Sequence, residues 1–221
     1  MTTLRWTPAL ALVALVALSG CATKTPLDYT AFQSAKPVTL LLMPPLNDSP
    51  DVKATPGVWA QATLPLAEAG YYVLPVALVN ETFQQNGVTT AHDAAQIPHE
   101  KLREFFGADA AVYIRVKKYG TSYFVILSDT RVEVEAKIVD LRTGKELWAG
   151  SAVASSTEQQ QQGGLAALLV AAVINQVVGT ATDAAFNYAA IAQARMLGAP
   201  RFNGVLPGPR SKLYGQPLPA R

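Results

Sequence analysis

The sequence predicts an α/β protein with a mixed sheet, flanked by helices and followed by Ala-rich C-terminal helices. Two short apolar runs, residues 38–43 and 71–76, enclose a helical pattern at 58–69, which is the order of a βαβ unit. Residues 112–154 then alternate apolar and polar side chains, as strands with one buried face do. We therefore expect a βαβ start that leads into a C-terminal antiparallel meander.

The N-terminal segment has the layout of a secretory signal. A short head that carries Arg5 precedes an Ala/Leu/Val run at residues 9–18, and this run is too short to cross a bilayer. The following Leu18-Ser19-Gly20-Cys21 resembles the lipobox of bacterial lipoproteins. That resemblance implies cleavage between Gly20 and Cys21, a diacylglycerol on the Cys21 thiol and an acyl chain such as palmitate on its amine. An ordinary secreted protein or an uncleaved anchor is the alternative.

Two or three acyl chains would fix the mature protein to a membrane. Ala22 and Thr23 stand where inner-membrane lipoproteins typically carry Asp, so the resemblance also implies the periplasmic face of the outer membrane. We expect four regions. They are a signal peptide (1–20), a lipidated tether (21–36), an α/β periplasmic domain with C-terminal helices (37–200) and an irregular Pro/Gly-rich tail (201–221) that orders against a partner.

The first half of the domain shows clear boundaries. Pro44 and Pro45 close the first strand, and residues 47–57 read as a polar loop. Gly70 ends the helix at 58–69, and Gly87 and Gly107 end two further helices, expected at 78–85 and 98–106. His92 and His99 are the only histidines, and Pro98 interrupts the segment between them. We expect solvated or capping histidines there, and no metal site.

The second half begins with the meander. We expect strands at 112–117, 123–127, 131–138 and 146–154, with turn chemistry at 140–145. A polar stretch with four consecutive glutamines, 155–164, follows as a linker. The apolar run at 165–178 is too short to span a bilayer. Burial in the core or a subunit interface is the main interpretation, and a membrane-surface helix is the alternative. Residues 181–197 form an alanine-striped helix suited to close packing.

The composition limits the partners. With 18 Lys+Arg against 16 Asp+Glu, the near-neutral chain does not indicate a nucleic-acid partner. Only 15% of residues are charged while 50% are hydrophobic, which indicates surface covered by membrane or by other subunits, including a possible homo-oligomer. The single cysteine leaves no disulfide.

Several segments together resemble a known family. They are the lipobox, the strand that ends Met43-Pro44-Pro45 with Asn47 after it, the segment 71–75, and the hairpin 139–148 with its Asp-Leu-Arg-Thr-Gly turn and Trp148. The chain is similar to the bacterial lipoproteins of unassigned function typified by the meningococcal genome-derived antigen lipoprotein. The resemblance implies a fold related to the TolB N-terminal domain and to CsgG-type lipoproteins. It also implies other lipoproteins of a CsgG-like system as partners, and it brings no catalytic residues.

The motifs do not favour an enzyme. The sequence contains no Gly-x-Ser-x-Gly, no phosphate-cradling glycine loop and no zinc-ligand spacing, and the sole cysteine is assigned to lipid. Asp129 with Arg131, and Asp140 with Arg142, are interpreted as surface pairs beside turns. We therefore expect no catalytic, metal or cofactor-binding residue. The expected function is that of a non-enzymatic subunit of an envelope assembly for secretion or transport. A regulatory lipoprotein that binds peptidoglycan or a cell-wall synthase is the alternative.

Overall fold

The computed structural model describes residues 25–123, 128–161 and 184–220. Cys21, the signal segment and the apolar run at 165–178 therefore lie outside the described residues. Within these ranges the chain forms a mixed α/β structure with an open six-stranded sheet. The strand order is β3 (Tyr72–Val73), β1 (Thr39–Leu42), β4 (Ala110–Tyr123), β5 (Ser128–Asp140) and β6 (Glu146–Ser155), and β2 (Leu46–Asn47) also pairs with β4. The predicted fold class is confirmed.

The βαβ start is β1 (Thr39–Leu42), α3 (Ala54–Glu68) and β3 (Tyr72–Val73). The two strands pair in parallel, with Thr39 opposite Tyr72 and Leu40 opposite Val73. Leu40, Leu41 and Leu42 are fully buried, because one face of β1 meets α3 while the strand lies inside the sheet.

Helix α3 begins four residues earlier than the sequence pattern suggested. Residues 54–57 were assigned to a loop, but Pro56 lies in the first turn, where its missing N–H costs no intrahelical hydrogen bond. Another short element, β2 (Leu46–Asn47), lies within the Pro-flanked segment and pairs in parallel with β4.

The meander contains three long strands, β4 (Ala110–Tyr123), β5 (Ser128–Asp140) and β6 (Glu146–Ser155), in antiparallel pairs. The predicted end of the first strand at residue 117 is wrong, because β4 continues through Gly120 to Tyr123, the first residue of the strand predicted at 123–127. Gly120 has a φ of +121°, which glycine adopts without strain, so the residue changes the path of the backbone and does not end the strand. Residues 124–127 lie outside the described residues.

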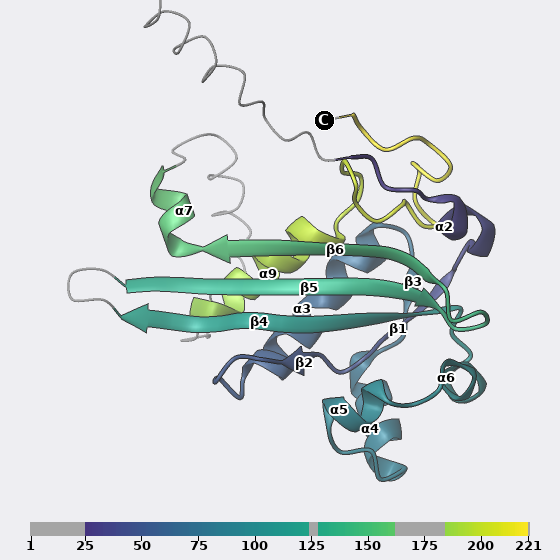
Figure 1. Ribbon diagram of the computed structural model, residues 1–221, viewed down its shortest axis with the longest axis horizontal. Coiled ribbons are helices and arrows are strands. Elements are labelled where there is room, and N and C mark those ends of the chain that lie inside the picture. Colours follow the sequence, from purple (N-terminus) through teal and green to yellow (C-terminus); the bar gives the residue numbers. More distant parts are fainter. Residues whose placement is uncertain (1–24, 124–127, 162–183, 221) are drawn as a thin grey trace, which may run out of the picture.

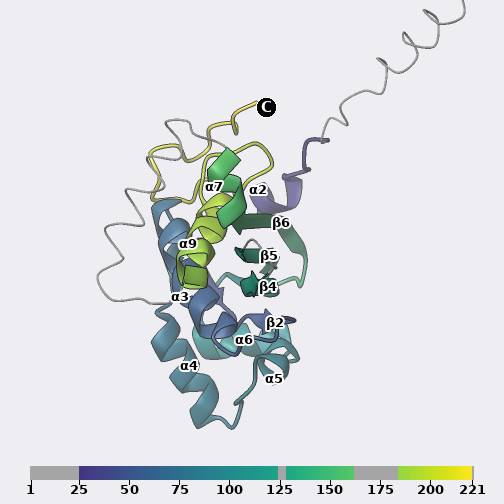
Figure 2. The ribbon, with the colours of Figure 1, turned by 90° about the vertical axis from the view of Figure 1, so that its left-hand side faces the viewer.

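Helices cover one face of the sheet. α3 and α9 (Ala184–Leu197) lie side by side over it, as Figures 1 and 2 show. The predicted alanine stripe is real, since Ala185, Ala189 and Ala192 are buried and bring α9 close to α3 and the sheet. Five shorter helices of the described residues lie elsewhere: α2 (Thr30–Ala35), α4 (Val76–Gln85), α5 (Ala91–Ala95), α6 (His99–Phe106) and α7 (Ser156–Gln161). None of the helices in the described ranges is long and apolar enough to cross a membrane.

Candidate functional site

Residues 25–36, the part of the expected tether that the structure describes, are attached to the domain. Helix α2 (Thr30–Ala35) falls within the residues assigned to the tether, and its Phe32 is only 3% exposed. The Phe32 ring packs against Tyr71 with centroids 6.5 Å apart. Apolar burial therefore fixes the second half of the expected tether to the body.

One side chain, Asn203, joins the beginning of the described chain to its C-terminal tail. Its Nδ2 donates to the Thr25 carbonyl oxygen over 2.8 Å, and its Oδ1 accepts from the Leu27 N–H over 2.9 Å. The Asn203 carbonyl oxygen in turn accepts from the indole Nε1 of Trp148 over 3.0 Å. We call this arrangement the Asn203 clasp. It holds Thr25 and Leu27, at the beginning of the described chain, against the domain.

The tail, residues 201–220, has no helix or strand, as expected, but it orders against its own domain. Gly208 donates its N–H to the Ala69 carbonyl oxygen over 2.7 Å, and Arg210 donates to that of Gly70 over 3.1 Å. Two tyrosine hydroxyls reinforce the contact. Tyr29 donates to the Gly204 carbonyl oxygen and Tyr71 to that of Leu206, each over 2.6 Å.

Burial raises the pKa of Tyr29 to about 12 and raises that of Tyr71 as well. Both hydroxyls therefore keep their protons, and remain donors, throughout the physiological range. Asn203, Tyr29 and Tyr71 were not singled out from the sequence. Their partners are backbone carbonyl oxygens about 135 to 178 residues away, and such contacts leave no motif.

An apolar cavity of about 630 Å³ lies between α2, Tyr71 and the tail. Its walls include Tyr29, Phe32, Tyr71, Leu206, Tyr214 and Pro217. The volume falls in the range of small-molecule and peptide sites, but the hydroxyls of Tyr29 and Tyr71 are already bonded to the backbone. The described wall can therefore recognise shape and apolar surface better than charge.

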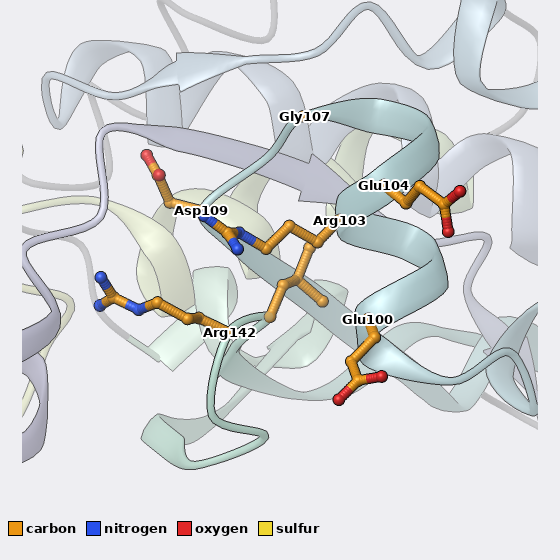
Figure 3. A pocket seen from close by; sticks show the side chains of 7 residues that line it. Glu100, Arg103, Glu104, Gly107, Asp109 and Arg142 are labelled. Atoms are coloured by element: carbon orange, nitrogen blue, oxygen red, sulfur yellow. The ribbon is translucent and has the colours of Figure 1, made fainter.

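A second cavity, of about 460 Å³, is lined by charged side chains from α6, the start of β4 and the β5–β6 turn. Figure 3 shows Arg103 and Arg142 in the neighbourhood of Asp109, with Glu100 and Glu104 on the helix. Asp109 is engaged, since its Oδ2 accepts the N–H groups of Val38 and Thr39, each over 2.9 Å. This carboxylate therefore holds the start of β1 beside the start of β4, inside the sheet.

The turn beside this cavity corrects one interpretation. Asp140 is 4% exposed and accepts from the backbone N–H groups of Arg142 and Thr143, over 2.7 and 3.1 Å. The predicted pair with Arg142 is present, with the Arg142 Nη2 3.4 Å from the Asp140 Oδ2, but Asp140 is buried and also shapes the turn. Arg131 pairs at 3.5 Å with Glu133, while Asp129 accepts from the Ser156 hydroxyl over 3.0 Å.

The histidines are placed on different helices. His92 lies in α5, and His99 begins α6 with its ring 6.2 Å from that of Tyr113. The described ranges contain no group of three His, Cys, Asp or Glu side chains that could hold a metal ion. Gly20 and Cys21, the predicted cleavage and lipid-attachment residues, lie outside the described residues, so their modification remains a prediction.

Known proteins resemble most of the chain. A family model described as "Putative lipoprotein GNA1162-like" matches residues 27–210. The protein described as "Putative lipoprotein NMB1124/NMB1162" of Neisseria meningitidis serogroup B is 47% identical over 203 residues, 91% of this chain and 94% of the relative. The crystal structure of lipoprotein GNA1162 from Neisseria meningitidis aligns at 49% identity with a TM-score of 0.54. That alignment covers 65% of this chain and all of the other.

More distant structures share the fold only in outline. A PelC dodecamer from Paraburkholderia phytofirmans aligns at 11% identity with a TM-score of 0.38, over 55% of this chain and 72% of the other. TolB from Acinetobacter baumannii aligns at 14% identity with a TM-score of 0.31, over 58% of this chain and 24% of the other. Likenesses at this level carry no functional argument.

Proposed function

The chain belongs to the GNA1162-like lipoprotein family, and from this premise we propose that it is a non-enzymatic subunit of a cell-envelope assembly. In this proposal a lipid on Cys21 holds the protein at the periplasmic face of the outer membrane, where it serves secretion or transport. Its partners are other envelope lipoproteins, and the CsgG-like system implied by the sequence resemblance is one candidate.

The observation that carries the proposal is the Asn203 clasp. It fixes Thr25, which is four residues after Cys21, and four extended residues reach at most about 14 Å. A lipid on Cys21 would thus hold α2, the tail and the neighbouring end of β6 close to the bilayer. A domain held in this position can act by binding neighbouring envelope proteins through its exposed surface.

The cavities support binding more than chemistry. Nucleophilic catalysis needs a nucleophile beside a base, and acid–base catalysis needs carboxylates free to exchange protons. In the polar cavity the Asp109 carboxylate is bonded to two backbone N–H groups. The walls of the apolar cavity are mainly aromatic and proline side chains, and the hydroxyls of Tyr29 and Tyr71 are already bonded to the backbone.

Replacing Cys21 by Ala tests the anchor. We expect wild-type protein to incorporate labelled palmitate and to fractionate with outer membranes, and Cys21→Ala to lose the label, because the thiol that carries the first lipid is gone. Ala22→Asp serves as the matched control, since it keeps Cys21 and should keep the label while moving to the inner membrane. Unlabelled wild-type protein with an unmodified thiol in its intact mass would contradict the anchor.

Native mass spectrometry of the detergent-extracted protein tests the assembly. We expect a homo-oligomer or a complex with another lipoprotein, because the low charge content leaves apolar surface to cover. A lipidated protein that is strictly monomeric and binds nothing from outer membranes would overturn the assembly and leave the anchor standing.

The alternative function is binding to peptidoglycan or a cell-wall synthase. It requires the basic side chains of the tail to be free to contact that partner. The Arg210 guanidinium lies 5.3 Å from the centroid of the Tyr72 ring, and the Arg210 backbone is bonded to Gly70. Because the tail is engaged with its own domain, this arrangement favours the first function. The side chain of Lys212 is exposed. If isolated cell wall pulled down the wild-type protein but not Lys212→Ala, the cell-wall-binding function would be favoured instead.

A further inference from the structure

The outer surface of the helical layer formed by α3 and α9 is unusually apolar. Apart from Glu68 at its end, the exposed residues of α3 recur at helical spacing and carry no charge: Pro56, Ala60, Leu64 and Ala67. Leu64 is 62% exposed, although a leucine at the centre of a helix face is ordinarily buried. The solvent-facing side of α9 adds Ala184, Asn187, Ala190 and Ala194, of which the first and last are exposed. A helix layer on a sheet normally turns a charged face to water, so this face has the character of a covered surface.

The chain itself supplies a segment of matching chemistry. Residues 159–182 contain no charged side chain, and 165–178 are almost entirely aliphatic. The segment leaves the described chain after α7 and rejoins it at Ala184, the first residue of α9. Both of its ends are therefore tied to the layer that needs covering. Arg195 of α9 also binds Glu158 of α7 at 2.7 Å, which holds α7 against α9.

Length and position agree as well. Fourteen helical residues extend about 21 Å, and the 15 residues of α3 extend about 22 Å. Gly57 near the start of α3 faces Phe186 near the start of α9, because a Cβ on Gly57 would lie 3.5 Å from the Phe186 ring. The point where the segment rejoins the chain is thus beside the beginning of the apolar stripe of α3.

We propose that residues 165–178 dock along the outer face of α3 and α9 and bury Leu64, which completes a three-helix layer over the sheet. The occupant is this segment, and neither the bilayer nor a second copy of the chain. Docking would remove a continuous apolar surface from water within one molecule, without the translational entropy that a second chain must lose. The proposal is independent of the lipid anchor.

Cysteine cross-linking of the full-length protein tests the docking. Leu64→Cys is combined in turn with Leu168→Cys, Leu169→Cys, Val170→Cys and Ala171→Cys, which together cover one helical turn, so at least one must face α3. We expect one or two of these pairs to form an intramolecular disulfide at monomer mass, in membranes and in detergent alike. Leu78→Cys is the matched control because Leu78 is 65% exposed on α4, and it should not pair with any of the four.

Thiol labelling supplies a second readout. We expect a bulky maleimide to label Leu64→Cys about tenfold or more slowly than Leu78→Cys, and expect Leu168→Glu with Leu169→Glu to remove that difference. A dimer-sized disulfide from Leu64→Cys alone would show that a second copy covers the face. Protection that is present in membranes and lost in detergent, without any cross-link, would assign the face to lipid. Equal labelling of Leu64→Cys and Leu78→Cys would show a bare face, and each of these three results overturns the proposal.

Discussion

The Asp48 carboxylate, directly after β2, joins this short strand to β4. Its Oδ1 accepts from Arg115 over 2.8 Å and its Oδ2 from Lys117 over 3.0 Å, both on β4. Its backbone N–H donates to the Val116 carbonyl oxygen over 2.9 Å and so extends the pairing of β2. The hydrogen bonds from Lys117 and then Arg115 hold the pKa of the Asp48 carboxyl below its usual value of 3.8.

This lowered pKa predicts an acid-dependent loss of stability. A carboxyl whose pKa is lower in the folded state stabilises the fold above its unfolded pKa of about 3.8, and that contribution disappears as pH falls through the folded pKa. We expect Asp48→Asn, which cannot ionise, to narrow the gap in unfolding free energy between pH 6 and pH 3. Urea titrations of wild type and variant at each pH measure it.

Salt provides the control for the Asp48 variant. The side chain is 34% exposed, so 1 M NaCl should screen both ion pairs and shrink the difference between wild type and Asp48→Asn. A wild-type profile that runs parallel to that of Asp48→Asn from pH 6 to pH 3 would contradict the stabilising role of this carboxylate.

At the scale of elements, the way the tail meets α3 depends on two glycines. Gly70 ends the α3 region with a φ of +98°, and a side chain there would collide with the backbone of Ser211 and with the Gly208 carbonyl oxygen. A side chain at Gly208 would similarly collide with the Gly70 carbonyl group. The close approach of these two backbones is what lets the tail bond to Ala69 and Gly70.

We therefore expect Gly70→Ala to be far more damaging than Gly87→Ala. Gly87 also has a positive φ, +77°, but nothing lies within 4 Å of an added Cβ, so its substitution should cost only the strain of about 1–2 kcal/mol. Gly70→Ala should cost that strain plus the displacement of the tail, about 3 kcal/mol or more in total, and should expose the tail to protease. Thermal melts and limited proteolysis of both variants measure this. Equal losses would show that the tail contact adds no stability.

Elements with a strong periodic pattern were predictable, and those fixed by distant backbone groups were not. β5 alternates cleanly from Arg131 to Ile138, and α9 carries its alanines on one face. The two-residue β2 has no period to detect. α5 depends on a cap in which the Thr90 hydroxyl accepts from the Asp93 N–H, and the sequence pattern did not reveal it. The sequence pattern places α2 in the tether, because the helix is short and, apart from its buried Phe32, consists of small and polar residues.

The candidate site was predictable only in part. The lipobox resemblance predicts Cys21 as the anchor residue, and that prediction lies outside the described residues. No periodicity or motif pointed to Asn203, Tyr29 or Tyr71. Each of these side chains bonds to a main-chain group brought near by folding, namely those of Thr25 and Leu27, Gly204, and Leu206. Main-chain partners are the same for every residue type, so the sequence pattern cannot identify them.

At the scale of the whole molecule, both described ends of the chain lie at one end of the domain. Figures 1 and 2 place α2 and the C-terminus together, well away from β2 and the loop that leads into α3. With Cys21 four residues before Thr25, a lipid on Cys21 would give the domain a preferred orientation on the membrane.

We therefore expect position-dependent quenching in vesicles whose lipid headgroups carry nitroxides. A dye on Leu27→Cys, near the anchor, should be quenched more than a dye on Val52→Cys, which is 85% exposed in the loop before α3. Inserting twelve Gly/Ser residues between Lys24 and Thr25 is the control, and should reduce the difference by freeing the domain. Equal quenching at both positions in the lipidated wild type would show that the domain has no fixed orientation.

The Asn203 clasp also has a mechanical consequence. A lipid anchor and a partner could pull the protein in opposite directions. The hydrogen bonds from Asn203 to Thr25 and Leu27 would then bear the force first, before the hydrogen bonds of any strand. The next attachments along the chain are the Tyr29 hydroxyl, which donates to the Gly204 carbonyl oxygen, and the buried Phe32 ring. Val38 and Thr39 follow, and both donate their N–H groups to Asp109. Fully extended, residues 25–37 span at most about 45 Å. Their release would therefore lengthen the connection to the membrane by less than that distance while the sheet stayed intact.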